Sequence, residues 1–254
     1  MPATPEFPAP EFGSEFLDIR PPWNAWDLLK TILGGLVLSL MLVATVLFGA
    51  KALASSDLLE VPRRVAVNLA ILSTYFGLLG SAWYFVLRRY RAQWQEVGLR
   101  PVSVKGLLAV LPVMLAVLAV NVGLTLVMTR LLGPINNPQK ESFAPGGVMT
   151  LSDLGWLFPH VAVAAPIVEE ILFRGMLYPY LRSRTSRSNA VLLSAGIFAS
   201  IHFIPVLWPF LFNLGIALAL VTERYKSIYP AILLHGLNNA LVVTGMYFSL
   251  HQGS

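Results

Sequence analysis

The chain contains no cysteine, and it carries little charge for its length. Without cysteine it has no disulfide, no thiolate metal site and no cysteine nucleophile, and it cannot itself be prenylated or palmitoylated. Charged residues make up 12% of its 254 residues, against about 25% in an ordinary soluble domain. Hydrophobic residues make up 56% and form long uncharged runs, so the composition indicates a multi-pass membrane protein.

Two catalytic motifs are also missing. No G-x-S-x-G occurs in the sequence, so the nucleophile elbow of the serine hydrolases is absent. No H-E-x-x-H occurs either, which excludes the zincin metalloproteases. The net charge of +5 lies mostly in short links between apolar runs, and it therefore indicates orientation in a membrane rather than binding to nucleic acid.

Uncharged stretches predict an all-α fold, a membrane bundle of seven transmembrane helices around a polar intramembrane cavity, with an eighth helix left open. About 20 apolar residues cross a hydrocarbon layer of about 30 Å. The long uncharged stretch 189–222 exceeds one span, and Pro205 and Pro209 divide it into two. The expected spans are 31–50, 65–87, 106–129, 154–180, 189–205, 208–222 and 227–250.

Outside these spans, the sequence predicts a Pro- and Glu-rich disordered tail at 1–25. A single transmembrane domain follows at 26–254. Trp23 and Trp26 sit where interfacial aromatic anchors occur. The tail and the links after the second, fourth and sixth spans carry 11 Lys and Arg, and the other side carries 5, so the positive-inside rule places the N-terminus in the cytoplasm.

The fourth expected span carries two adjacent carboxylates, Glu169 and Glu170, followed by Arg174. A charged residue at the centre of a membrane helix costs about 2.5–3.5 kcal/mol on insertion scales, and such residues mark functional sites. Glu170 and Arg174 are four residues apart with the acid first, which favours an ion pair and a structural role. Glu169 points about 100° away on a helix, so it needs polar partners on other helices.

Two further polar clusters lie at intermediate depth. The fifth span contains Phe198 and His202, and the seventh contains His235 and Asn239, which share one helix face. Phe198 alone is expected to pack in the core. We expect the helices to bring Glu169, His202, His235 and Asn239 to one buried pocket.

These groups suit hydrolysis of an amide. Burial favours the neutral form of a carboxylic acid, which makes a carboxylate a better general base, and a histidine can hold water or carry a proton to the leaving amine. An amide or imidazole donor to the oxyanion is worth roughly 10²–10³ in rate. Glu169, His202 and His235 also form a sufficient ligand set for a catalytic divalent metal such as zinc, so a metal mechanism stays open beside one without a cofactor.

Each cluster also has a structural interpretation. His202 alone suits a core histidine, and His160 a histidine at the membrane boundary. His235 with Asn239 suits interhelical hydrogen bonding, worth about 0.6 kcal/mol per bond. The coincidence of three clusters favours function.

In these residues the chain resembles the CPBP family, which comprises type II CAAX proteases and bacteriocin-processing or self-immunity membrane proteins. That family is marked by E-E-x-x-x-R, then F-x-x-x-H, then H-x-x-x-N. The motifs stand here in the same order, and the resemblance covers roughly 154–243, the expected protease-like core.

The resemblance implies an intramembrane endopeptidase whose cavity opens to the cytoplasm and whose substrate is a membrane-anchored or lipidated peptide or protein. It implies that Glu169 and His202 activate water, and that His235 and Asn239 stabilise the oxyanion. It also implies that Glu170 and Arg174 hold the site in shape. A glutamate-type mechanism is favoured over a metal-dependent one.

Two other functions remain open. The chain can be a non-catalytic immunity or sorting factor on the same scaffold. It can also be a transporter whose buried glutamate carries protons, which is disfavoured because no inverted repeat is visible.

Overall fold

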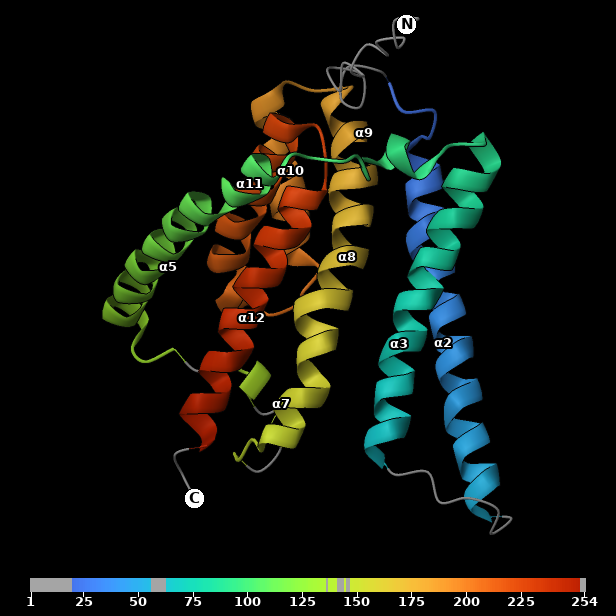
Figure 1. Cartoon of the computed structure of the whole chain (residues 1–254), viewed down its shortest axis with the longest axis vertical. Helices are drawn as coiled ribbons and strands as arrows, with labels where there is room; N and C mark the ends of the chain where they lie inside the picture. Colours follow the sequence, from blue (N-terminus) through green and yellow to red (C-terminus); the bar gives the residue numbers. More distant parts are fainter. Residues whose placement is uncertain (1–19, 56–62, 136, 141–143, 145–146, 252–254) are drawn as a thin grey trace, which may run out of the picture.

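The computed structural model describes residues 20–55, 63–135, 137–140, 144 and 147–251. The expected tail lies outside these residues up to position 19. The described part of the chain is helical and contains no strand (Figure 1). The all-α fold class is therefore confirmed.

Among the described residues, six helices are long and apolar enough to cross a membrane. The fifth expected span differs, because α10 (Arg187–Ser200) has only 14 residues and spans about 21 Å. The count of seven therefore corresponds to six long helices and one short one. The six are Ala25–Ala52, Val67–Arg88, Val104–Leu132, Leu151–Arg182, Pro205–Tyr225 and Tyr229–Leu250.

The first two long helices form a hairpin, with α2 (Ala25–Ser55) packed along α3 (Arg63–Ala82). They approach closely because the pairing uses small residues: a Cβ added to Gly77 would lie 2.6 Å from the backbone nitrogen of Ser39. The Ser39 hydroxyl donates to the carbonyl of Thr74 at 3.0 Å.

The two tryptophans before and within this hairpin have different environments. Trp26 is 61% exposed, whereas Trp23 is buried and its indole N–H donates to the carbonyl of Met176 at 3.1 Å. Trp23 therefore packs against the helix that carries the glutamates. Between them, the side chain of Asn24 accepts from the backbone of Trp26 at 2.8 Å and of Asp27 at 3.2 Å, which caps α2.

The π-helical end of the hairpin, η1 (Trp83–Arg88), leads through a short link to α5 (Val110–Leu132), which belongs to the third long helix. This link contains a 3₁₀ turn, η2 (Trp94–Val97), and a short helix, α4 (Val104–Leu108). α5 then leans away from the other long helices towards its end (Figure 1).

The glutamates lie on one long helix that changes geometry along its length. It begins at α7 (Leu151–Phe158), where Thr150 and Asp153 form a capping box. Glu169 and Glu170 end an α-helical stretch between two π-helical segments, and such segments are frequent at functional sites. The successive segments are η3 (Pro159–Ala164), α8 (Ala165–Glu170), η4 (Ile171–Leu177) and α9 (Tyr178–Arg182).

The last three helices bring the histidines to the glutamates. α10 ends at Ser200, and the chain reverses through η5 (Pro205–Leu207) into α11 (Trp208–Tyr225), as the two prolines predict. α12 (Tyr229–His251) then runs beside α8 (Figure 1).

The bundle has two ends with different charge. We call the end with the links η1–α4, α9–α10 and α11–α12 the basic end, and the end with the links α2–α3 and α5–α7 the opposite end. The links and helix ends at the basic end contain Arg88, Arg89, Arg91, Arg100, Lys105, Arg182, Arg184, Arg187, Arg224 and Lys226.

Candidate active site

The ion pair that the sequence predicts is present and completely buried. Arg174 Nη1 lies 3.2 Å from Glu170 Oε1, and both side chains are inaccessible to solvent. Arg174 Nη2 also donates to the carbonyl of Gly215 at 3.0 Å. A Cβ on Gly215 would lie 2.9 Å from Cα of Ala195, so this glycine lets α10 and α11 approach beside the arginine.

Glu170 has a second partner that the helical spacing did not predict. Its Oε1 lies 2.9 Å from Nδ1 of His235. Because a carboxylate only accepts, Nδ1 carries the hydrogen. The other ring nitrogen, Nε2, faces Glu169 Oε2 at 3.9 Å. Glu170 therefore orients His235 as well as neutralising Arg174.

His202 is oriented by the end of its own helix. It follows the last residues of α10, and its Nδ1 lies 2.8 Å from the carbonyl oxygen of Phe198. A carbonyl also only accepts, so Nδ1 again carries the hydrogen, and the contact satisfies a carbonyl that the helix end leaves free. The Nε2 atom of His202 faces Glu169 Oε2 at 4.0 Å.

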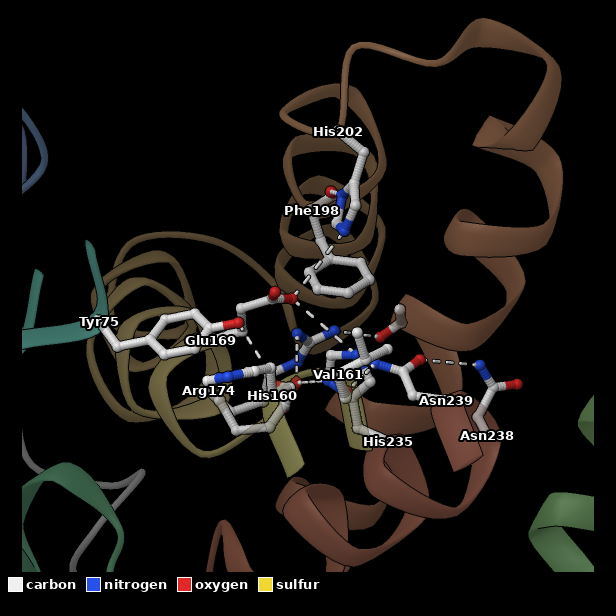
Figure 2. Close-up of polar contacts among 12 residues, drawn as sticks. Tyr75, His160, Val161, Glu169, Arg174, Phe198, His202, His235, Asn238 and Asn239 are labelled. Carbon is white, nitrogen blue, oxygen red and sulfur yellow. Dashed lines mark hydrogen bonds and ion pairs between the residues drawn. The ribbon is translucent and has the colours of Figure 1, made fainter. Parts of the chain in front are cut away.

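Glu169 lies between the two imidazoles (Figure 2). Its Oε2 is a buried atom with no hydrogen-bond partner among the described residues, although the side chain as a whole is 27% exposed. Polar atoms more than about 3.5 Å apart can be joined by a bridging water. The carboxylate and both Nε2 atoms thus converge on one position.

Phe198 separates and supports the two histidines. Its ring meets His202 at a centroid distance of 5.0 Å and His235 at 5.6 Å, both edge to face. The guanidinium carbon of Arg174 lies 4.7 Å from the same ring centroid, which is within the range of a cation–π interaction.

The asparagines of α12 form a short chain of hydrogen bonds. Asn239 donates one amide hydrogen to the carbonyl of Val161 at 2.9 Å and accepts from Asn238 at 3.3 Å. This fixes the carboxamide of Asn239 beside the site, with its second amide hydrogen available.

A cavity of about 470 Å³ adjoins these groups. Glu169, His202, His235, Asn238 and Asn239 all line it. Further lining comes from α5, α11, α12 and the α5–α7 link, including Asn121, Thr125, Gln139, Phe210, Leu211 and Val242. The structure thus brings the four candidate catalytic residues to one pocket.

Sequence reasoning missed a second polar cluster beside Glu169. His160 is buried within its helix rather than at a boundary, and its Nε2 is hydrogen-bonded to Oδ1 of Asn68. The Tyr75 hydroxyl lies 3.4 Å from the carbonyl of His160 (Figure 2). Asn68 and Tyr75 lie on α3, and polar residues within its apolar run were the indication available.

The donor types suit zinc better than the spacing does. One carboxylate and two imidazole nitrogens are a familiar zinc set, but ligand atoms of a tetrahedral site lie roughly 3.3 Å apart. The distances from Glu169 Oε2 to the two Nε2 atoms are 3.9 and 4.0 Å, and among the described residues no three His, Cys, Asp or Glu side chains are placed so that they could hold a metal ion. The arrangement therefore does not fit zinc without a shift of the side chains.

The six apolar helices and the partly buried Glu–His–His cluster define an integral membrane protein with a polar site between its helices. Residues 151–241 match the family model of the Rce1-like type II CAAX prenyl endopeptidases. The match spans all three motifs and confirms the resemblance to the CPBP family. No curated protein and no solved structure matches the chain.

Proposed function

We propose that the chain is an intramembrane endopeptidase that hydrolyses a peptide bond of a membrane-anchored or lipidated substrate with water activated by Glu169 and His202. The match at 151–241 supports an intramembrane protease of the CAAX type in general. The observation that carries the finer proposal is the unpartnered Glu169 Oε2, 4.0 and 3.9 Å from two imidazole nitrogens beside the cavity.

The attacking water occupies the position on which Glu169 Oε2 and the two Nε2 atoms converge. It donates one hydrogen to Glu169 Oε2 and another to Nε2 of His202 in its neutral form. As its oxygen attacks the scissile carbonyl carbon, Glu169 takes the proton as general base.

The oxyanion that forms receives hydrogen bonds from Asn239 and His235. Asn239 supplies the amide hydrogen that does not bind Val161. His235 donates from Nε2 as an imidazolium, which the Glu170 carboxylate at Nδ1 stabilises. The C–N bond then breaks, and the proton held by Glu169 passes through His202 to the leaving amine.

Replacement of the base tests this mechanism. In Glu169→Gln, we expect cleavage to fall at least about 10³-fold, because the variant cannot take the proton. The measurement uses purified protein in nanodiscs with two probes, a farnesylated peptide ending in a CAAX sequence and an unlipidated transmembrane peptide, and mass spectrometry of the products.

The matched control is Glu223→Gln. Glu223 is also buried, but it pairs with Tyr178 and Arg182 at the basic end, away from the cavity. This control should retain cleavage. Full activity of Glu169→Gln would contradict the proposed mechanism.

A metal-dependent version of the protease is the second candidate. Glu169, His202 and His235 are its ligands, and a divalent metal would supply a bound water of lowered pKa. We favour the glutamate-type mechanism because the three donor atoms lie farther apart than a zinc tetrahedron requires. Stoichiometric zinc in the purified wild type, lost in His202→Ala, would favour the metal.

A non-catalytic immunity or sorting factor is the candidate from another class. The burial of Arg174 and Glu170 would serve such a scaffold equally well, whereas the unpartnered Glu169 would have no role. Full biological activity of a Glu169→Gln strain would therefore favour this alternative.

A further inference from the structure

A second hollow lies outside the catalytic cavity, as a groove between α5 and α11. Its volume is about 350 Å³, and none of its lining residues lines the cavity. Val120 on one wall and Leu220 on the other are exposed, so the groove opens outwards, to where lipid surrounds the bundle. The apolar walls include Val113, Ala116 and Val120 of α5, and Ile216, Ala217 and Leu220 of α11.

A polar pair separates this groove from the cavity. Asn213 lines the groove, and its amide nitrogen donates to the carbonyl of Val117 at 3.2 Å and to Oδ1 of Asn121 at 2.8 Å. Asn121 in turn lines the cavity. Both amide hydrogens of Asn213 therefore bind α5, and the groove is a separate site rather than an extension of the cavity.

The other end of the groove carries a cation. Arg224 lies in the last turn of α11, where the apolar span Pro205–Tyr225 ends, and its side chain is exposed. Its neighbour Glu223 is already paired with three other cations. In the part of the chain that the structure describes, Arg224 forms no ion pair, and no other charged residue lines the groove.

The short helix α4 adds a second cation at this end. It lies close to the groove because a Cβ added to Gly106 would be 3.3 Å from the ring of Tyr225, which also lines the groove. Lys105, the residue before this glycine, is exposed. Cations at the end of a membrane helix attract anionic headgroups by about 1 kcal/mol each.

The length of the groove matches one leaflet of a bilayer. From Asn213 to Arg224 it follows about 16 Å of α11. One leaflet contributes about half of a hydrocarbon layer of about 30 Å. A hydrocarbon chain whose headgroup lies at Arg224 therefore reaches Asn213 near the middle of the membrane.

We propose that the groove between α5 and α11 binds one anionic phospholipid, with its phosphate on Arg224 and an acyl chain along the apolar walls. A guanidinium matches the geometry of a phosphate, and an acyl chain needs no hydrogen bonds from the walls. A zwitterionic lipid fits less well, because its own cation would lie near Arg224 and Lys105. This site does not depend on the proposed proteolysis.

Lipid binding to the purified full chain tests the headgroup. Native mass spectrometry from detergent micelles compares phosphatidylglycerol with phosphatidylcholine of the same acyl chains. We expect one phosphatidylglycerol per chain, bound at least about tenfold more tightly than phosphatidylcholine. Arg224→Gln should weaken phosphatidylglycerol about tenfold, because a charge-assisted hydrogen bond is lost. Equal binding of the two lipids to the wild type would overturn the proposal.

The matched control is Arg88→Gln, which removes one charge at the same end of the bundle. Arg88 lies on η1, over the rings of Trp83 and Tyr84, and does not line the groove. It should bind phosphatidylglycerol as the wild type does. An equal loss in Arg88→Gln and Arg224→Gln would show that only net charge matters and would overturn the site.

A second pair of variants tests the acyl chain. Ala116 and Ala119 are both exposed on α5, but only Ala116 lines the groove. Ala116→Phe fills the groove with a ring and should weaken phosphatidylglycerol at least about tenfold, whereas Ala119→Phe should leave binding unchanged. Wild-type binding by Ala116→Phe would show that the groove holds no chain.

Two other occupants give different results in the same spectra. Displacement of the lipid by inorganic phosphate would show that the cations hold a free anion, and would overturn the lipid. A dimer of the wild type that Ala116→Phe converts to a monomer would show that a second copy of the chain fills the groove, and would overturn it as well.

Discussion

The N-terminal hairpin and the helices α8–α12 are both apolar, but they use their polar groups differently. In the hairpin, hydroxyls donate to nearby carbonyls, as Ser81 does to Thr31 at 2.8 Å, and glycine allows close packing at Gly77. In α8–α12, charged and titratable groups bind one another across helices, as Glu170 does with His235. Neutral contacts of the first kind stabilise a scaffold, whereas buried charge of the second kind is costly at membrane depth and marks a candidate functional site.

The two parts meet at few places. Trp23 donates to Met176, Asn68 is hydrogen-bonded to His160, and the Tyr75 hydroxyl approaches the carbonyl of His160. If the hairpin is scaffold and the later helices form the site, changes in the two parts should separate stability from cleavage.

The largest effect on stability is expected at the buried arginine. Arg174→Met leaves the Glu170 carboxylate buried without its cation, which should lower the free energy of unfolding by about 3–5 kcal/mol. Chemical unfolding in detergent micelles measures this. Arg182→Met is the control, because the buried Glu223 keeps Arg187 at 3.8 Å and Lys226 at 3.7 Å when the partly exposed Arg182 is removed, so we expect a loss of about 0–1 kcal/mol. Equal losses of unfolding free energy in the two variants would contradict the expected difference between the fully buried ion pair and the partly exposed one.

The next largest effect on stability is expected at Gly215, where α10 and α11 pack closely. Gly215→Ala places a Cβ 2.9 Å from the backbone of Ala195, and such overpacking should cost about 1–3 kcal/mol and move the carbonyl that Arg174 binds. Gly245→Ala on α12 has open space and should cost nothing. We expect a lower melting temperature and slower cleavage for Gly215→Ala alone.

The third largest effect on stability is expected at Trp23, which contacts the helix that carries Glu169 and Glu170. Trp23→Phe removes the indole N–H from the Met176 carbonyl and should destabilise the protein by about 1–2 kcal/mol. Trp26→Phe, at an exposed position, should have no measurable effect. Cleavage per folded molecule should stay at the wild-type value in both, and a selective loss for Trp23→Phe would assign the hairpin a part in the chemistry.

The smallest effect is expected at Tyr75. Its hydroxyl lies 3.4 Å from the carbonyl of His160, a long hydrogen bond, so Tyr75→Phe should change stability by at most about 0.5 kcal/mol. Cleavage should not change. A strong loss of cleavage without a loss of stability would show that α3 contributes to the site, and would end the division between scaffold and site.

The sequence by itself determined the membrane class, the order of the helices and the candidate residues of the proposed site. Apolar runs of about 20 residues admit few other folds, and Glu169, His202 and His235 stand out because charged or titratable groups are rare in such runs. The spacing of Glu170 and Arg174 also fixed their ion pair, because residues four apart on a helix are neighbours.

Only the tertiary structure decided the features of the site that depend on packing between helices. Glu170 binds His235, α10 ends within the bundle, and a cavity and a separate groove remain between the helices. Hydrophobicity specifies that a side chain is buried but not against which neighbour. The shape of the cavity and of the groove therefore follows from how the side chains fill the space between the helices.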